Sequence, residues 1–256
     1  MERDDAYRQV VNTKRGRAND SLPPDRFIPL PWWMSPRFRT VLFDLDGTLL
    51  DHFSAIHRAH THVRRHYGLP DATREEVLRA IGGGLPEALK KTLGPTHDHL
   101  LEEALPVYRA YWDATMLDDA VLFPGAINLL AELQAAGVVC AVFTNKHGPS
   151  ARRVCSHLGL DPLLAGVFGA TDTPWLKPQP EFTAHVLRAL SAEEASTALV
   201  GDSPWDVDAA RLGKLIGCFA VTTGTHSAGE LHAHGAVFVA PGLSNLKGEL
   251  LTGTHS

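Results

Sequence analysis

The segment Val41–Asp51 constrains the fold more than any other, because an apolar run leads straight into Asp-Leu-Asp-Gly-Thr. The apolar run predicts a buried strand. Side chains alternate along a strand, so Asp44 and Asp46 would share one side if the strand continued, and Gly47 would let the chain turn sharply. Open α/β sheets bind ligands at such strand ends. Burying two carboxylates has a large desolvation cost, so the pattern predicts a metal site or a nucleophile paired with an acid.

The composition is typical of a globular protein, with 44% hydrophobic and 21% charged residues among 256. This length is enough for one large domain or two smaller ones. No apolar run approaches the roughly 20 residues of a membrane span, and no segment has the pattern of a signal peptide. The cysteines Cys140, Cys155 and Cys218 are far apart, which favours reduced thiols and predicts a cytoplasmic protein.

The charge is unevenly distributed along the chain. Residues 1–39 hold eight Lys or Arg and five Asp or Glu, whereas residues 40–256 hold sixteen and twenty-four. An acidic body argues against a nucleic-acid partner and is compatible with binding a divalent cation. Residues 1–39 are polar and contain four prolines before Met34, so we expect a flexible N-terminal extension. The alternative is that Met34 is the natural start of the protein.

Strands and helices alternate from Thr40 onward, which predicts an α/β fold with a doubly wound parallel sheet. Residues 53–117 interrupt this alternation with about four helical segments and no strand. We therefore expect a core of residues 40–52 and 118–256, with a small all-α cap domain (53–117) inserted after the first strand. Within it, Gly82-Gly83-Gly84 predicts a flexible loop between helices. The expected strands are 40–45, 138–143, 166–169, 197–200, 216–221 and 236–239, and the expected core helices are 125–136, 149–158, 181–190 and 205–212.

Three further polar signals lie near the ends of later strands. Thr144-Asn145-Lys146 offers a hydroxyl and amides suited to phosphate. Lys177 lies in a loop fixed by two prolines. Gly201-Asp202-Ser203-Pro204-Trp205-Asp206 supplies two more carboxylates at the start of a helix. Each signal alone has an ordinary explanation as a turn, a solvated lysine or a helix cap. All of them together, in this order and with the first motif, indicate one site.

Together these motifs resemble the four motifs of the haloacid dehalogenase superfamily. The likeness extends from about Thr40 to the C-terminus. The motif spacing, the helical insert and Phe123-Pro124-Gly125 are similar to its phosphoglycolate-phosphatase-like members. The resemblance implies a Rossmann-like core with a helical cap that closes over the site.

The resemblance also implies a role for each motif residue. Asp44 would attack phosphorus and form an aspartyl-phosphate. Asp46 would protonate the leaving group and then deprotonate the attacking water. Thr144 and the Asn145 amide would hold phosphoryl oxygens, and Lys177 would offset the repulsion between nucleophile and phosphate.

The implied cofactor is Mg²⁺, held by Asp44, the main-chain carbonyl of Asp46 and Asp202. Asp206 would be a further ligand or would orient Asp202. The implied activity is a Mg²⁺-dependent phosphomonoester hydrolase that acts on a small phosphorylated metabolite, nominally 2-phosphoglycolate. The expected assembly is a monomer or homodimer.

Two alternatives stay open. A sugar phosphomutase of the same fold keeps both aspartates of the first motif, although Thr48 differs from the residue expected in β-phosphoglucomutases. A non-catalytic phosphate-sensing protein is disfavoured, because Asp44, Asp46, Lys177 and Asp202 are all present. Asp46 also argues against a dehalogenase or a phosphonatase.

Other polar residues are interpreted with less weight. Three histidine pairs are expected to be exposed and not to bind zinc, because no cysteine lies near them: His60 and His62, His97 and His99, and His232 and His234. Three histidines could face the substrate, namely His52, His57 and His147. Three cap cations could hold a substrate carboxylate, although a solvated helix face is the simpler interpretation: Arg58, Arg64 and Arg65.

Overall fold

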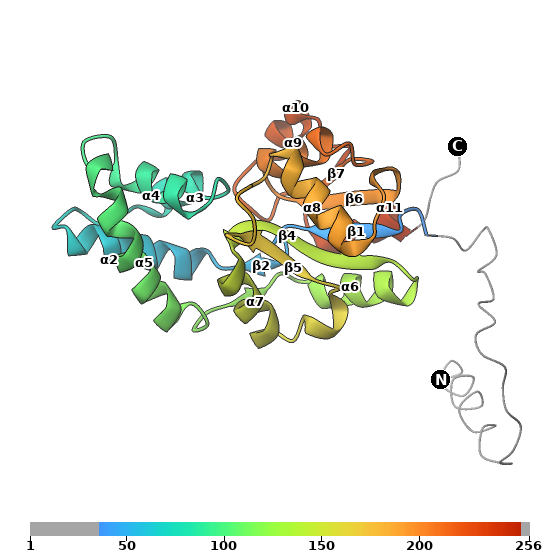
Figure 1. Ribbon diagram of the computed structural model, residues 1–256, viewed down its shortest axis with the longest axis horizontal. Coiled ribbons are helices and arrows are strands. Elements are labelled where there is room, and N and C mark those ends of the chain that lie inside the picture. Colours follow the sequence, from blue (N-terminus) through green and yellow to red (C-terminus); the bar gives the residue numbers. More distant parts are fainter. Residues whose placement is uncertain (1–35, 252–256) are drawn as a thin grey trace, which may run out of the picture. The chain divides into compact units, whose positions relative to one another are not determined.

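The computed structural model describes residues 36–251, and a six-stranded parallel sheet forms its centre (Figure 1). The strand order is β5-β4-β1-β6-β7-β8, which confirms the predicted doubly wound α/β fold. The strands are β1 (Thr40–Phe43), β2 (Leu50–Asp51), β3 (Val121–Leu122), β4 (Val139–His147), β5 (Val167–Ala170), β6 (Thr197–Gly201), β7 (Cys218–Val221) and β8 (Phe238–Ala240).

Strand β1 lies in the middle of the sheet, between β4 and β6. Its residues are all buried because helices cover both faces. Val41 and Phe43 belong to a core cluster with residues of α6 and α7, whereas Leu42 packs with residues of α8 and α9 (Figure 1). The core helices are α6 (Ala126–Ala135), α7 (Gly148–His157), α8 (Pro180–Leu190), α9 (Pro204–Leu212), α10 (Ala228–His234) and α11 (Lys247–Leu251).

Four α-helices lie between β2 and β3, and we call residues 53–115 the helical insert (Figure 1). They are α2 (Phe53–His66), α3 (Arg74–Ala80), α4 (Leu85–Leu93) and α5 (Leu101–Thr115). The two segments that connect the core to the insert form the antiparallel strands β2 and β3, which pair with each other. These strands have two residues each, which is too short to leave a sequence pattern. That the insert is a separate, mobile domain stays a prediction.

Two strands end two or more residues away from the predicted carboxyl-terminal position. Strand β1 ends at Phe43 and not at 45, because Leu45 starts a tight turn in which its carbonyl accepts bonds from the N–H groups of Leu49 and Leu50. The premise of a continued strand was therefore wrong, and Asp44 and Asp46 do not share a strand face. Strand β4 runs to His147, beyond the predicted end at Phe143.

Residues 1–35 lie outside the described residues, and with them most of the predicted N-terminal extension. Phe38, near the end of that predicted segment, is buried against Phe219, with ring centroids 5.3 Å apart. Within residues 36–251, every helix is too short or too polar to cross a bilayer. The three cysteines are buried free thiols.

Candidate active site

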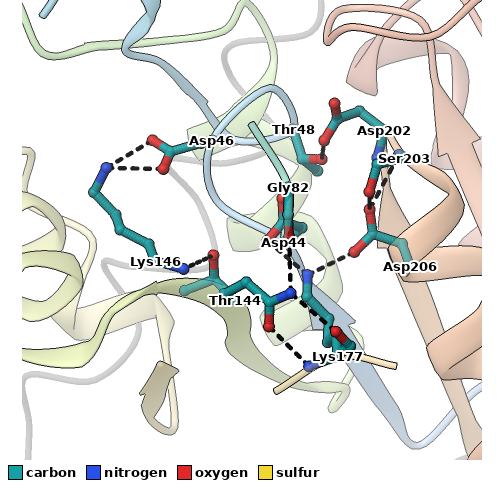
Figure 2. Close-up of polar contacts among 11 residues, drawn as sticks. Asp44, Asp46, Thr48, Gly82, Thr144, Lys146, Lys177, Asp202, Ser203 and Asp206 are labelled. Carbon is teal, nitrogen blue, oxygen red and sulfur yellow. Dashed lines mark hydrogen bonds and ion pairs between the residues drawn. The ribbon is translucent and has the colours of Figure 1, made fainter. Parts of the chain in front are cut away.

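Three buried side chains from distant segments meet beyond the carboxyl end of β1 (Figure 2). Lys177, in the loop before α8, places its Nζ 2.7 Å from Asp44 Oδ1 and 2.6 Å from Asp206 Oδ1. Asp44 follows β1, and Asp206 lies in the first turn of α9 after β6. Because adjacent parallel strands end at the same edge, the sheet brings these motifs together.

Asp202 lies beside this group in a space that only glycines allow. Thr48 Oγ1 donates to Asp202 Oδ1 at 3.1 Å. A Cβ added to Gly224 would lie 1.7 Å from Asp202 Oδ2, and one added to Gly47 would lie 2.6 Å from it. Gly47 also has φ of +89°, which disfavours other residues. The Asp202 carboxylate therefore lies close to the main chain of Gly47 and Gly224, where a side chain would not fit.

Asp206 has both carboxylate oxygens in use. Its Oδ2 accepts from Ser203 Oγ at 2.6 Å and from the main-chain N–H groups of Ser203 and Asp202 at 3.1 and 3.2 Å. Its Oδ1 bonds to Lys177. Asp206 thus ties the loop after β6 to Lys177, which favours an orienting role over direct ligation.

The three carboxylates hold more buried negative charge than the single ammonium of Lys177 can balance. Oxygens of Asp44, Asp202 and Asp206 all lie within 4.8 Å of one another, and Lys177 is the lysine that contacts them. Burial raises the pKa of Asp44 to about 6, and the charge of Asp206 adds to this although Lys177 opposes it. Burial and the charges of Asp44 and Asp206 raise the pKa of Asp202 well above its usual value. An all-oxygen donor set with excess negative charge fits a hard divalent cation such as Mg²⁺.

Asp46 has a different partner, Lys146, whose role sequence reasoning missed. Lys146 Nζ lies 2.9 and 2.8 Å from the two oxygens of Asp46 (Figure 2). It also lies 4.6 Å from the ring centroid of Trp112. His52 Nδ1 lies 3.6 Å from Asp46 Oδ1. Burial would raise the pKa of Asp46, but Lys146 and His52 lower it to about 2. The two-residue spacing of Thr144 and Lys146 could have indicated that both face the site.

Asn145 joins the core to the helical insert. Its Nδ2 donates to Gly82 O at 2.8 Å and to Lys177 O at 3.0 Å, and its Oδ1 accepts from Lys177 N at 2.8 Å. The side-chain amide is therefore engaged, so a bond from Asn145 to phosphate would come from its main chain. Thr144 is buried, and its Oγ1 accepts a bond from Lys146 N.

The triple-glycine loop between α3 and α4 contacts the core. A Cβ added to Gly82 would lie 2.7 Å from Trp205 Cδ1, and one added to Gly83 would lie 3.3 Å from its Cζ2. The interpretation of a plain flexible loop was therefore incomplete, since the missing side chains let this loop approach Trp205 and Asn145.

A pocket lies over Asp44, between the core and the helical insert. Its floor includes Asp44, Asp46, Thr144, Lys177 and Asp202, and its walls include Ile56, His60, Ile81, Leu85, Ala88, Tyr108, Arg109, Trp112, Asp113, Lys146 and His147.

The histidine predictions are partly correct. His60 is 1% exposed and lines the pocket, so the expectation of an exposed residue was wrong; its Nδ1 bonds to Thr92 Oγ1 at 2.8 Å inside the insert. His147 lines the pocket as expected. His52 is buried against Trp112, and His57 bonds to Ala72 O. Of the other paired histidines, His62, His99, His232 and His234 are exposed as predicted, and His97 is half-buried.

The three predicted cap cations do not line this pocket. Each forms an ion pair within or beside the insert: Arg58 with Asp119, Arg64 with Glu76, and Arg65 with Asp71.

Comparison with known proteins identifies the family. Residues 41–215 match the haloacid dehalogenase-like hydrolases. The chain belongs to this family. A relative from Dickeya dadantii (strain 3937), named "Probable phosphatase IndB", is 33% identical over 196 residues, covering 75% of this chain and 85% of that protein. A phosphoglycolate phosphatase of Pseudomonas syringae pv. syringae is 30% identical over 193 residues, covering 73% of this chain and 70% of that protein.

Another relative of this hydrolase has a different activity in its name. The tyrosine-protein kinase PtkA of Mycobacterium tuberculosis is 34% identical over 171 residues, and the match spans 66% of this chain but 57% of the kinase. A solved PtkA structure superposes with a TM-score of 0.70 at 31% identity, covering 83% of this chain and 98% of that one. The family match confirms the predicted superfamily, and the phosphatase-named relatives support a phosphatase.

Proposed function

We propose that this hydrolase is a Mg²⁺-dependent phosphomonoesterase that acts through an aspartyl-phosphate on Asp44. The observation that carries the proposal is the buried group of Asp44, Asp202 and Asp206 around Lys177 at the floor of a pocket. Such a group combines a carboxylate nucleophile with fixed positive charge, as phosphoryl transfer requires.

The nucleophilic atom is Asp44 Oδ2. Lys177 binds the other oxygen, Oδ1, and Oδ2 has no hydrogen-bond partner in the part of the chain that the structure describes. In the first step Oδ2 forms a bond to phosphorus while the bond from phosphorus to the leaving oxygen breaks. Lys177 offsets the negative charge that the nucleophile and the phosphoryl group share. The Thr144 hydroxyl hydrogen has no acceptor within residues 36–251, so it can donate to a phosphoryl oxygen.

Asp46 moves the protons. In the first step it gives a proton to the leaving oxygen, and in the second it takes one from the water that attacks phosphorus and releases Asp44. Lys146 keeps Asp46 ionised in this structure, which is the form that the second step needs. Protonation of Asp46 for the first step requires this contact to loosen.

Mg²⁺ would be held by Asp44, the main-chain carbonyl of Asp46 and Asp202. It would neutralise the excess carboxylate charge and that of the bound phosphoryl group. Asp206 would orient the loop and Lys177.

The nominal substrate is 2-phosphoglycolate, in agreement with the name of the Pseudomonas relative. We place the enzyme in the cytoplasm as a monomer or homodimer. A sugar phosphomutase would use the same residues but return the phosphoryl group to a second sugar hydroxyl.

The test is hydrolysis of a panel of phosphorylated metabolites and of p-nitrophenyl phosphate, with and without Mg²⁺. Wild type should release inorganic phosphate only with the metal, and Asp44→Asn should lower the rate by at least about a thousandfold. Full activity of Asp44→Asn would refute the nucleophile. Conversion of hexose 1-phosphates to 6-phosphates without phosphate release would indicate the mutase.

The PtkA relative makes phosphoryl transfer to protein tyrosine a second candidate, which the same assay can include. The protein is incubated with labelled ATP and a tyrosine-containing peptide. Label on the peptide that depends on Asp44 would favour the kinase, and label found only as inorganic phosphate would favour the hydrolase.

A further inference from the structure

One cation of the pocket lacks a partner among residues 36–251. Of the lysines that line the pocket, Lys177 pairs with Asp44 and Asp206, and Lys146 pairs with Asp46. Arg109, on α5, also lines the pocket and is half-buried. Within residues 36–251 its guanidinium forms neither a hydrogen bond nor an ion pair. A half-buried guanidinium without an anion is an available binding group, because its five donors match an oxyanion.

The groups around Arg109 do not satisfy it. The carboxylate of Asp113, one turn later on α5, lies 3.7 Å from Arg153 and is 60% exposed. Burial lowers the pKa of His147, and the charge of Arg109 lowers it further. Burial also lowers the pKa of His60, to about 3. Both histidines are therefore neutral near pH 7, so within the described part of the chain Arg109 supplies the unpaired positive charge of this pocket.

The walls beside Arg109 are apolar. Ile56 on α2, Ile81 after α3, Leu85 and Ala88 on α4, and Trp112 on α5 line the same pocket. Such walls favour a leaving group with hydrocarbon or aromatic surface. Glycolate, with one methylene group, would leave most of this surface without contact.

We propose that Arg109 selects phosphomonoesters whose leaving group carries a carboxylate on an apolar body larger than glycolate. The inference rests on the proposed phosphomonoesterase function, and it replaces 2-phosphoglycolate with a larger carboxylated ester as the expected substrate. One guanidinium matches one carboxylate in charge and binds it through two parallel bonds. A second phosphate would bring two negative charges to a single cation with Asp113 nearby, so a carboxylate is favoured.

The test compares three aryl phosphates in Mg²⁺ buffer: phenyl phosphate, 4-carboxyphenyl phosphate and hydroquinone bisphosphate. For each variant, kcat/KM on the carboxylated ester is divided by kcat/KM on phenyl phosphate. Arg109→Leu should lower this ratio by about 10- to 100-fold, the usual effect of losing a charged hydrogen-bonded pair. Arg109→Lys keeps the charge without the planar fork and should give an intermediate ratio.

Arg79→Leu is the matched control. Arg79 lies on α3 of the same insert, pairs with Glu75 on the surface and does not line the pocket. It should leave the ratio at the wild-type value. A ratio within about threefold of wild type in Arg109→Leu would overturn the proposal, because a lost charged bond exceeds that effect. A wild-type preference for the bisphosphate over the carboxylated ester would overturn the choice of carboxylate.

A binding measurement separates this inference from the proposed function. Calorimetry measures the affinity of 4-carboxyphenyl phosphate for the Asp44→Asn protein and for the same protein with Arg109→Leu added. A weaker affinity in the double variant supports the role of Arg109 even if wild type hydrolyses none of the esters, a result that would refute only the phosphatase. Equal affinities would overturn the role of Arg109 whatever the activity.

Discussion

Replacing Lys177 with methionine tests the electrostatics of the site. Methionine has a similar length but no charge, so Lys177→Met would leave Asp44 and Asp206 buried without the ammonium that lies 2.7 and 2.6 Å from them. Removing one partner of a buried ion pair costs about 3–5 kcal/mol. For a domain of this size each kcal/mol changes Tm by about 2–4 °C, so we expect Tm to fall by roughly 6–20 °C at pH 7.5 in EDTA.

The measurement is thermal unfolding followed by circular dichroism at pH 7.5 and pH 5. The loss should be smaller at pH 5, because Asp44 can then take up a proton and the buried negative charge decreases. Lys91→Met is the matched control: Lys91 pairs with Glu87 on the exposed face of α4, and such surface pairs contribute about 0.5 kcal/mol or less. A Tm of Lys177→Met equal to that of wild type at pH 7.5 would refute this reasoning. An equal fall in Tm at both pH values would also refute it.

Three further predictions concern the same carboxylates. Burial raises the pKa of Asp44 from 3.8 to about 6 in the folded protein, so the folded state binds the Asp44 proton more tightly than the unfolded state. The contribution of Asp44 to the unfolding free energy of the metal-free protein should therefore fall by up to about 3 kcal/mol as pH rises from about 4 to 6. Urea titrations of wild type and Asp44→Asn should differ over this interval. Gly224→Ala would put a Cβ 1.7 Å from Asp202 Oδ2 and should abolish the rise in Tm on adding Mg²⁺, whereas Gly229→Ala, with no atom within 4 Å, should keep it. Thr48→Val removes the 3.1 Å bond to Asp202 and should weaken Mg²⁺ binding by about 10-fold or more in calorimetry, with an unchanged affinity contradicting an orienting role.

The convergence of the motifs could be predicted because it follows from topology. Val41–Phe43 is apolar on both faces, which is typical of a central parallel strand, and the residues after neighbouring parallel strands meet at one edge. Asp44, Lys177 and Asp202 were placed at that edge from their positions after strands, and the structure brings them together.

The direction of Asp46 could not be predicted in this way. It depends on where β1 ends, and this is set by the turn from Leu45 to Leu50. The partner of Asp46, Lys146, depends on the extension of β4 to His147. Neither feature has a local sequence signal of its own.

The pocket residues of the insert were also beyond sequence reasoning. Arg109 and His60 lie on helices without a motif, and their access to the pocket depends on how α2, α4 and α5 pack together. His60 is buried because Thr92 provides a partner for its ring nitrogen, a contact between residues 32 positions apart in the chain.

The most direct test of the account is to locate the phosphoryl group during turnover. Wild type and Asp46→Asn are mixed with substrate and Mg²⁺, quenched in acid within the first turnover, digested and examined by mass spectrometry. The account predicts a phosphoryl group on the peptide that contains Asp44, at the Asp44 carboxylate. With p-nitrophenyl phosphate, whose leaving group needs no proton, more of it should accumulate in Asp46→Asn because only its release by water is slowed. Phosphate release without any phosphorylated Asp44, or a phosphoryl group on another residue, would contradict it.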